Sequence, residues 1–129
     1  MTTAVQERTF KVPVGAFTDE VTDDRGRINA RSLARALDLP LSTIAPALAF
    51  KVRWLSENPT AQNAQPKAVM LLNAANELAG ALGGKKYVVL YLKTAQPDFN
   101  GETPADQLKK GRLEFFCGYV DEVVTLRPD

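Results

Sequence analysis

The chain is organised around residues 92–111, which read LKTAQPDFNGETPADQLKKG. Asn100-Gly101 readily adopts the positive backbone angles of a tight turn. Thr103 can cap a helix by accepting a backbone N–H, and Pro104 suits the first helical position. Gly111 then predicts a helix end about two turns later, through a left-handed residue. We therefore expect a loop that leads into a short helix.

Residues 1–24 mix apolar and acidic positions. Phe10, Val12 and Val14 alternate with other residues, and this pattern predicts an extended or partly disordered arm rather than a helix. A turn is expected at Asp23-Asp24-Arg25-Gly26, and Asn29 is well placed to cap a helix that runs to about residue 37.

Residues 25–60 have the apolar spacing of a helix-turn-helix-like subdomain. The pattern from Leu33 to Ile44 predicts two short helices with a tight connection, in which Asp38 stands where glycine is commonest. Ser42 is expected to cap the second helix. The helix that would read DNA is either this second helix or a following one over residues 51–56, and the pattern does not choose between them.

This subdomain is also the basic part of the chain. Residues 25–57 hold six basic and two acidic residues, although the net charge of the whole chain is only +1. Cations attract DNA phosphates, but an excess of this size is equally typical of a solvated face. The candidate DNA-binding residues are Arg31, Arg35, Ser42, Thr43, Lys51 and Arg53.

Residues 61–129 are expected to form a second subdomain. A short polar connection covers residues 58–65, after which Pro66 predicts the start of the longest helix and Gly83-Gly84 its end. Residues 87–92 have the strongest strand propensity in the chain, so local propensity predicts a strand there.

The last helix, expected from about residue 112 to residue 124, is unusually aromatic. One of its faces carries Leu113, Phe116, Cys117, Val120 and Val124, and a neighbouring face carries Phe115, Tyr119 and Glu122. Burial of both faces would use much of the core of so small a domain. We therefore expect one of them to meet another chain.

The chain has one cysteine and no histidine. An internal disulfide, a Ser/His/Asp triad, a Cys/His nucleophile and a zinc site with His or Cys ligands therefore cannot be assembled within it. We expect a protein that is not an enzyme and that holds no metal or cofactor, with Cys117 as a small buried hydrophobe. The sequence has neither a secretory signal nor an apolar run of about 20 residues, so we expect a cytoplasmic protein without a membrane segment.

The C-terminal half resembles the toxin-binding domain of the Xre/MbcA/ParS-type antitoxins. The residues that carry the resemblance are Tyr91-Leu92-Lys93-Thr94, Phe99, Gly101-Glu102-Thr103-Pro104, Leu108, Gly111 and the apolar run from Leu113 to Val124. The resemblance implies an all-α fold, a small helical bundle in which a helix-turn-helix-like unit precedes a helical toxin-binding domain over residues 61–129. It also implies a helix at residues 87–92, where a lone strand would find no sheet to join.

The resemblance further implies a function without catalysis. Proteins of this family bind RES-type toxins, which consume NAD, and block the cofactor pocket of the toxin sterically. A homodimer that represses its own operon by binding operator DNA is also implied. The toxin-binding residues expected on this basis are Phe99, Pro104, Phe115, Tyr119, Leu126 and Arg127. The alternative is a DNA-binding transcriptional regulator without a toxin partner, whose C-terminal helices only dimerise.

Overall fold

The computed structural model describes residues 14–126, and these residues fold into α-helices joined by short loops. The α-helices are α2 (Thr18–Val21), α3 (Ala30–Ala36), α4 (Leu41–Leu48), α5 (Val52–Glu57), α6 (Gln65–Leu82), α7 (Lys85–Leu92), α8 (Pro104–Lys109) and α9 (Leu113–Leu126). Two 3₁₀ turns, η1 (Gln62–Ala64) and η2 (Pro97–Phe99), lie between them. Within residues 14–126 there is no strand, so the expected all-α class is confirmed.

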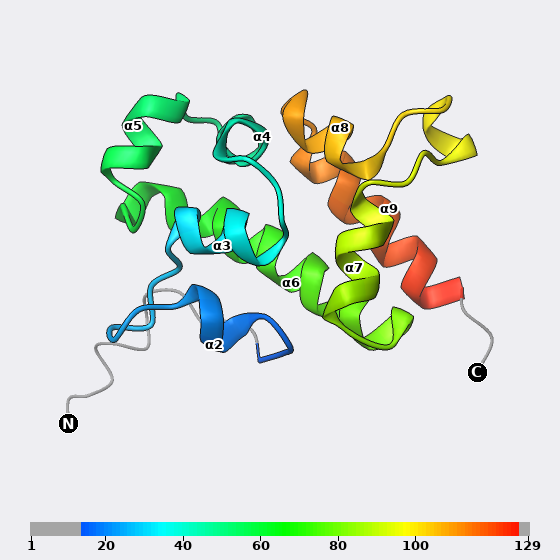
Figure 1. The fold of residues 1–129 in the computed structure, drawn as a ribbon, viewed down its shortest axis with the longest axis horizontal. Helices are drawn as coiled ribbons and strands as arrows, with labels where there is room; N and C mark the ends of the chain where they lie inside the picture. Colours follow the sequence, from blue (N-terminus) through cyan, green and yellow to red (C-terminus); the bar gives the residue numbers. More distant parts are fainter. Residues whose placement is uncertain (1–13, 127–129) are drawn as a thin grey trace.

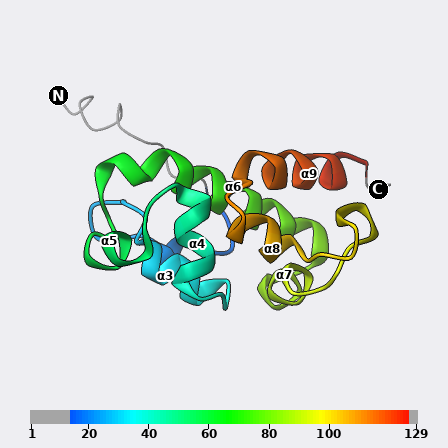
Figure 2. The same cartoon turned by 90° about the horizontal axis from the view of Figure 1, so that it is seen from above.

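The long helix α6 crosses the molecule and connects two groups of helices. Figures 1 and 2 show α3, α4 and α5 gathered at one end of α6, and α7, α8 and α9 at the other. The two groups also touch directly, because α4 packs against α8. The buried apolar side chains of both groups form one continuous cluster, from Phe17 in the N-terminal part to Val120 on α9.

The arm expected over residues 1–24 is wrong for the part that the structure describes. Phe17 and Val21 are fully buried, and Thr18–Val21 forms α2. The backbone N–H of Phe17 donates to Asn76 Oδ1 on α6 at 2.9 Å, which anchors this segment over a sequence separation of 59 residues. Burial of a phenylalanine ring outweighs the weak local alternation from which the arm was predicted. Residues 1–13 lie outside the described part of the chain.

The helices α3 and α4 follow the predicted turn and capping chemistry only in part. Asn29 Oδ1 accepts from the backbone N–H groups of residues 31 and 32, so the predicted cap of α3 is confirmed. Asp38 takes the left-handed conformation expected of a glycine there, with φ 58°. The cap predicted at Ser42 is wrong. Instead α4 begins at Leu41 after Pro40, and no side chain caps it, because the ring of Pro40 has no group that could accept a hydrogen bond.

The segment that local propensity assigns to a strand is the helix α7. Its residues Val88 and Leu92 are buried four positions apart, so they lie on one face of a helix that packs on α6. Gly83 ends α6 with φ 94°, as expected. Tertiary packing has overridden the strand propensity of the valines and tyrosines.

The start of α8 confirms the expected capping chemistry. Thr103 Oγ1 accepts from the N–H of Asp106 at 3.0 Å, and Asp106 Oδ2 accepts from the N–H of Thr103 at 2.9 Å. These two bonds form a capping box. Asn100-Gly101 has the positive φ angles of the expected turn, and Gly111 follows the helix with φ 76°.

This capping box predicts a stability that depends on pH. The hydrogen bond from the Thr103 N–H is the largest influence on the pKa of Asp106 and holds it below its ordinary value. A carboxylate whose pKa is lower in the folded state stabilises that state above the unfolded pKa, and this contribution is lost as the pH falls through the folded pKa. We expect Asp106→Asn to lower the free energy of unfolding by about 1 kcal/mol near pH 7. Urea denaturation near pH 2.5 should show a smaller difference, whereas an equal difference at both pH values would contradict the assignment.

No helix within residues 14–126 combines the length and the apolar character needed to span a membrane.

Candidate partner-binding surface

Three aromatic residues that the sequence singled out lie together where η2 meets α9. The ring centroid of Phe99 is 4.6 Å from that of Tyr119 and 5.6 Å from that of Phe115, and both pairs are tilted. We call Phe99, Phe115 and Tyr119 the aromatic cluster. Phe115 and Tyr119 are four positions apart on α9, so the helix presents them on one face.

The loop before α8 holds Phe99 against α9. The Gln96 N–H donates to the Glu102 carbonyl at 2.9 Å, and the Gln96 carbonyl accepts from Phe99 and Gly101. These bonds close the loop around η2 and turn the Phe99 side chain inward, where only 4% of it is exposed. Phe115 covers it and is itself 51% exposed. Phe99 therefore forms the buried side of the aromatic cluster, and Phe115 forms its exposed side.

A hydroxyl group marks the edge of the cluster on the α7 side. Tyr119 donates from its hydroxyl to Asp98 Oδ2 at 3.2 Å. Burial, followed by this bond to a carboxylate, raises the pKa of Tyr119. Burial and the nearby Tyr119 likewise raise the pKa of Tyr91 on α7. Both phenols therefore stay neutral near pH 7. The Tyr119 hydroxyl donates a hydrogen bond, whereas within residues 14–126 the buried Tyr91 hydroxyl has no hydrogen-bond partner.

An apolar groove on α7 continues the surface beyond Tyr91. It has a volume of about 260 Å³ and is lined by Leu82, Tyr87, Leu90, Tyr91, Thr94 and Gln96. Leu90 is 64% exposed and Tyr87 is 44% exposed. Neither residue stands out in the sequence, because residues 87–92 form an apolar run in which no helical face can be recognised. Once α7 is a helix, the burial of Val88 and Leu92 puts Leu90 on the opposite side.

Two residues expected at the partner surface are buried in the monomer. Pro104 is packed at the start of α8, and Phe99 is covered by the two other rings of the aromatic cluster. Their role as direct contacts stays a prediction, which burial in the isolated chain makes harder to fulfil, although Phe99 supports the two residues that are accessible. Leu126 ends α9, and Arg127 lies outside the described residues.

The residues expected to bind DNA divide between α3, α4 and α5. Arg31 and Arg35 are exposed on α3, and Lys51 and Arg53 are exposed at α5. Ser42 is exposed, but Thr43 is only 6% exposed, so the structure does not present its side chain on the surface as the predicted contact with DNA requires. Most of α4 is buried because this helix lies between α3 and α8.

Helix α5 is more accessible than α4. Only Leu55 is buried on it, whereas Val52 and Trp54 are exposed. The Trp54 ring stacks on Phe50 with centroids 4.7 Å apart and an interplanar angle of 20°. Arg53 forms an exposed ion pair with Glu57 at 3.6 Å, which stabilises the helix only slightly. Of the two helices that could contact DNA bases, α5 is the one with a solvent-exposed face.

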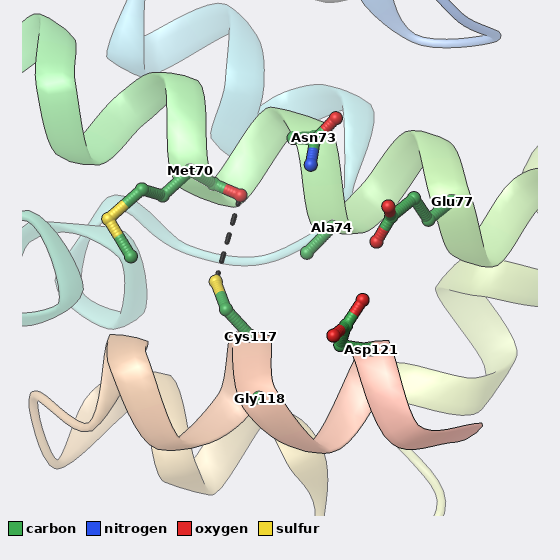
Figure 3. A pocket seen from close by; sticks show the side chains of 7 residues that line it. All are labelled: Met70, Asn73, Ala74, Glu77, Cys117, Gly118 and Asp121. Atoms are coloured by element: carbon green, nitrogen blue, oxygen red, sulfur yellow. Dashed lines mark hydrogen bonds between the residues drawn. The ribbon is translucent and has the colours of Figure 1, made fainter. Parts of the chain in front are cut away.

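A separate hollow lies between α6 and α9 and is lined by Cys117 (Figure 3). Cys117 is half-buried, and burial, followed by nearby carboxylates, raises the pKa of its thiol to about 11. A neutral thiol is a poor nucleophile, so Cys117 is inert near pH 7. Among residues 14–126, no three side chains of the His, Cys, Asp and Glu types converge as metal ligands would.

No model of a known protein family, no curated protein and no solved structure matches this chain.

Proposed function

We propose that this protein is a non-catalytic antitoxin that inhibits a toxin by covering it with the surface formed by α9 and α7. The observation that carries the proposal is the half-exposed Phe115, which is held by Phe99 beside the accessible Tyr119. Aromatic residues with a rigid base are typical hot spots of protein interfaces, because they lose little conformational entropy on binding.

The apolar groove on α7 enlarges the proposed interface. Tyr91 lines this groove and also lies next to Tyr119, so the groove and the aromatic cluster are neighbours. Polar groups border the apolar centre, since Gln96 lines the groove and Asp98 accepts the hydrogen bond of Tyr119. This distribution matches the anatomy of interfaces that bind another protein, with an apolar core inside a polar border.

The resemblance described above provides the identity of the partner, a RES-type toxin that consumes NAD. Inhibition would be steric, since the antitoxin would cover the cofactor pocket and contribute no reacting group. We propose that the protein works in the cytoplasm, as a homodimer that also represses its own operon.

Co-expression with the product of the neighbouring gene tests the proposed partnership. We expect the two proteins to purify together and the chain to restore growth to cells that the partner alone arrests. A partner that is toxic by itself, yet neither binds this chain nor is neutralised by it, would exclude the antitoxin function.

The second candidate is a DNA-binding regulator without a toxin partner. It is favoured by the free face of α5, where Lys51 and Arg53 flank the exposed Val52. Such a regulator would read DNA with α5 rather than α4, because α4 is covered by α3 and α8. In an antitoxin the same helix would serve the repression of its own operon.

The DNA contacts of α5 can be tested by the salt dependence of binding. With the chain's own promoter fragment, we expect Lys51→Ala combined with Arg53→Ala to reduce the slope of log K against log salt by about 2, since each phosphate contact contributes about 1. Lys109→Ala, which removes an exposed cation on α8, is the matched control and should leave the slope unchanged. Equal slopes for all three proteins would exclude α5 as the DNA-binding element.

A further inference from the structure

The groove on α7 offers apolar contact to an occupant. None of the residues that line it is charged, and Leu90, which is 64% exposed, stands in its middle. Its polar groups already have partners within the chain. The Thr94 hydroxyl donates to the Leu90 carbonyl at 2.7 Å, and Gln96 Nε2 donates to the Thr94 carbonyl at 3.0 Å. An exposed apolar surface of this kind is typical of a binding site for another chain.

A cation without an ion pair lies at one end of the groove. Lys85 and Lys93, at the two ends of α7, each form an ion pair with a carboxylate from another part of the chain. Lys86 is exposed in the first turn of α7 and forms no ion pair with any residue from 14 to 126. Its Nζ lies 5.2 Å from the ring centroid of Tyr87, which lines the groove. The ammonium group at the groove is thus available to a carboxylate of another molecule.

A carboxylate lies at the opposite end. Asp98 belongs to η2, which Figure 1 shows beyond the C-terminal end of α7. It is exposed, and none of the cations in the described part of the chain pairs with it. Burial, followed by the nearby Tyr119 and the charge of Asp98, raises the pKa of Tyr91, so Asp98 is close to a residue that lines the groove.

A surface with a cation at one end, an anion at the other and an apolar middle is complementary to itself. If a second copy is turned by 180° about an axis through the middle of the groove, its two ends exchange places. Lys86 of each copy then faces Asp98 of the other, and the two apolar linings meet around Leu90. A partner with a single sign of charge would match one end of the groove and be repelled at the other. The charge pattern therefore favours a second copy of this chain as the occupant.

We propose that two copies of this chain bind each other through the groove on α7, with two reciprocal ion pairs between Lys86 and Asp98 and with the two Leu90 side chains in contact at the two-fold axis. The proposal gives the homodimer a specific interface, and it does not rest on inhibition of a toxin. Since the groove is also part of the surface proposed for the toxin, a second copy and a toxin would compete for it.

Sedimentation equilibrium of the full chain, with no other protein present, tests this interface. We expect a reversible dimer. Leu90→Asp should raise its dissociation constant about 100-fold, because two carboxylates would meet at the axis. Lys86→Glu and Asp98→Lys should each raise it about tenfold or more, since two attractive contacts become repulsive. Lys109→Glu, which reverses an exposed charge on α8, is the matched control and should leave it unchanged.

A mixture of the two charge variants tests the two-fold arrangement. Dimers of Lys86→Glu alone oppose two carboxylates at each contact, and dimers of Asp98→Lys alone oppose two ammonium groups. In a mixed dimer each contact joins one carboxylate to one ammonium group, so we expect the mixture to dimerise about as tightly as the native chain. Thermal unfolding of each variant confirms that it is folded.

Three results would overturn the proposal. The first is a native chain that stays monomeric up to about 1 mM. The second is a dimer that Leu90→Asp leaves intact, because the interface would then lie elsewhere. The third is a mixture of Lys86→Glu and Asp98→Lys that is no more dimeric than either variant alone.

Discussion

Phe115→Asp is expected to weaken the proposed complex with a toxin about 100-fold or more, which corresponds to about 2.7 kcal/mol. The substitution removes an exposed aromatic contact and places a charge that the complex must bury without a partner. The same change should lower the free energy of unfolding by only about 1 kcal/mol, because it removes a half-exposed ring and its contact with Phe99. The measurement is the affinity of purified proteins by calorimetry, with thermal unfolding of the variant alone.

Two further variants test which part of the surface is responsible for the loss of affinity. Leu90→Asp tests whether the groove on α7 belongs to the same interface and should also reduce affinity, by at least about tenfold. Asp121→Asn changes an exposed residue on α9 that faces α6 rather than the aromatic cluster, and it should have no measurable effect. If Phe115→Asp binds as tightly as the native chain and still rescues growth, the aromatic cluster is not the surface that contacts the toxin.

The turns and helix caps are the features that the sequence predicted best. The caps at Asn29 and Thr103 and the left-handed residues at Asn100 and Gly111 were all confirmed. Each of them depends on bonds between residues no more than six positions apart, so a short stretch of sequence contains the whole determinant. The Ser42 cap failed although its chemistry is equally local, because Pro40 offered another start for α4.

The burial of the candidate site residues depended on contacts between distant segments. Thr43 and Pro104 were expected on binding surfaces, yet both are buried, and α4 and α8, to which they belong, pack on each other. That contact joins helices about 60 positions apart in the chain, and no periodicity within either helix predicts it. In contrast, the exposure of Phe115 beside Tyr119 could be predicted. Both residues lie on one face of the last helix, and the neighbouring apolar face already supplies enough side chains to pack against the core.

The structural role of Gln65 was the hardest to predict from the sequence. Gln65 stands at the end of a polar run that was expected to be an exposed connection, yet it is 2% exposed. Its Oε1 accepts from the Ile28 N–H at 2.8 Å, and its Nε2 donates to the Ile28 carbonyl at 2.9 Å. One amide side chain thus satisfies both backbone groups of a buried residue 37 positions away. Only the folded chain brings the two together.

We expect Gln65→Met to lower the free energy of unfolding by about 3 kcal/mol. The thioether fills a similar volume, but the N–H and the carbonyl of Ile28 both lose their partner in a buried position, and each unsatisfied group costs about 1 to 3 kcal/mol. Gln62→Met is the matched control, since Gln62 is exposed on η1 and its replacement should change stability by less than about 0.5 kcal/mol. Urea denaturation of the two variants measures the difference, and equal stabilities would show that the bonds to Ile28 contribute little.

Gln65→Glu distinguishes lost hydrogen bonds from altered packing. A protonated carboxyl group offers one donor and one acceptor, as the amide does, whereas a carboxylate only accepts and would face the Ile28 carbonyl. Burial would raise the pKa of this glutamate in the folded state, so the stability of the variant should be highest below its unfolded pKa and should be lost as the pH rises through the folded value. Unfolding measured from about pH 4 to about pH 8 should therefore show the variant approaching the native chain at the acidic end. A deficit that is the same across this range would point to packing, because packing does not respond to protonation.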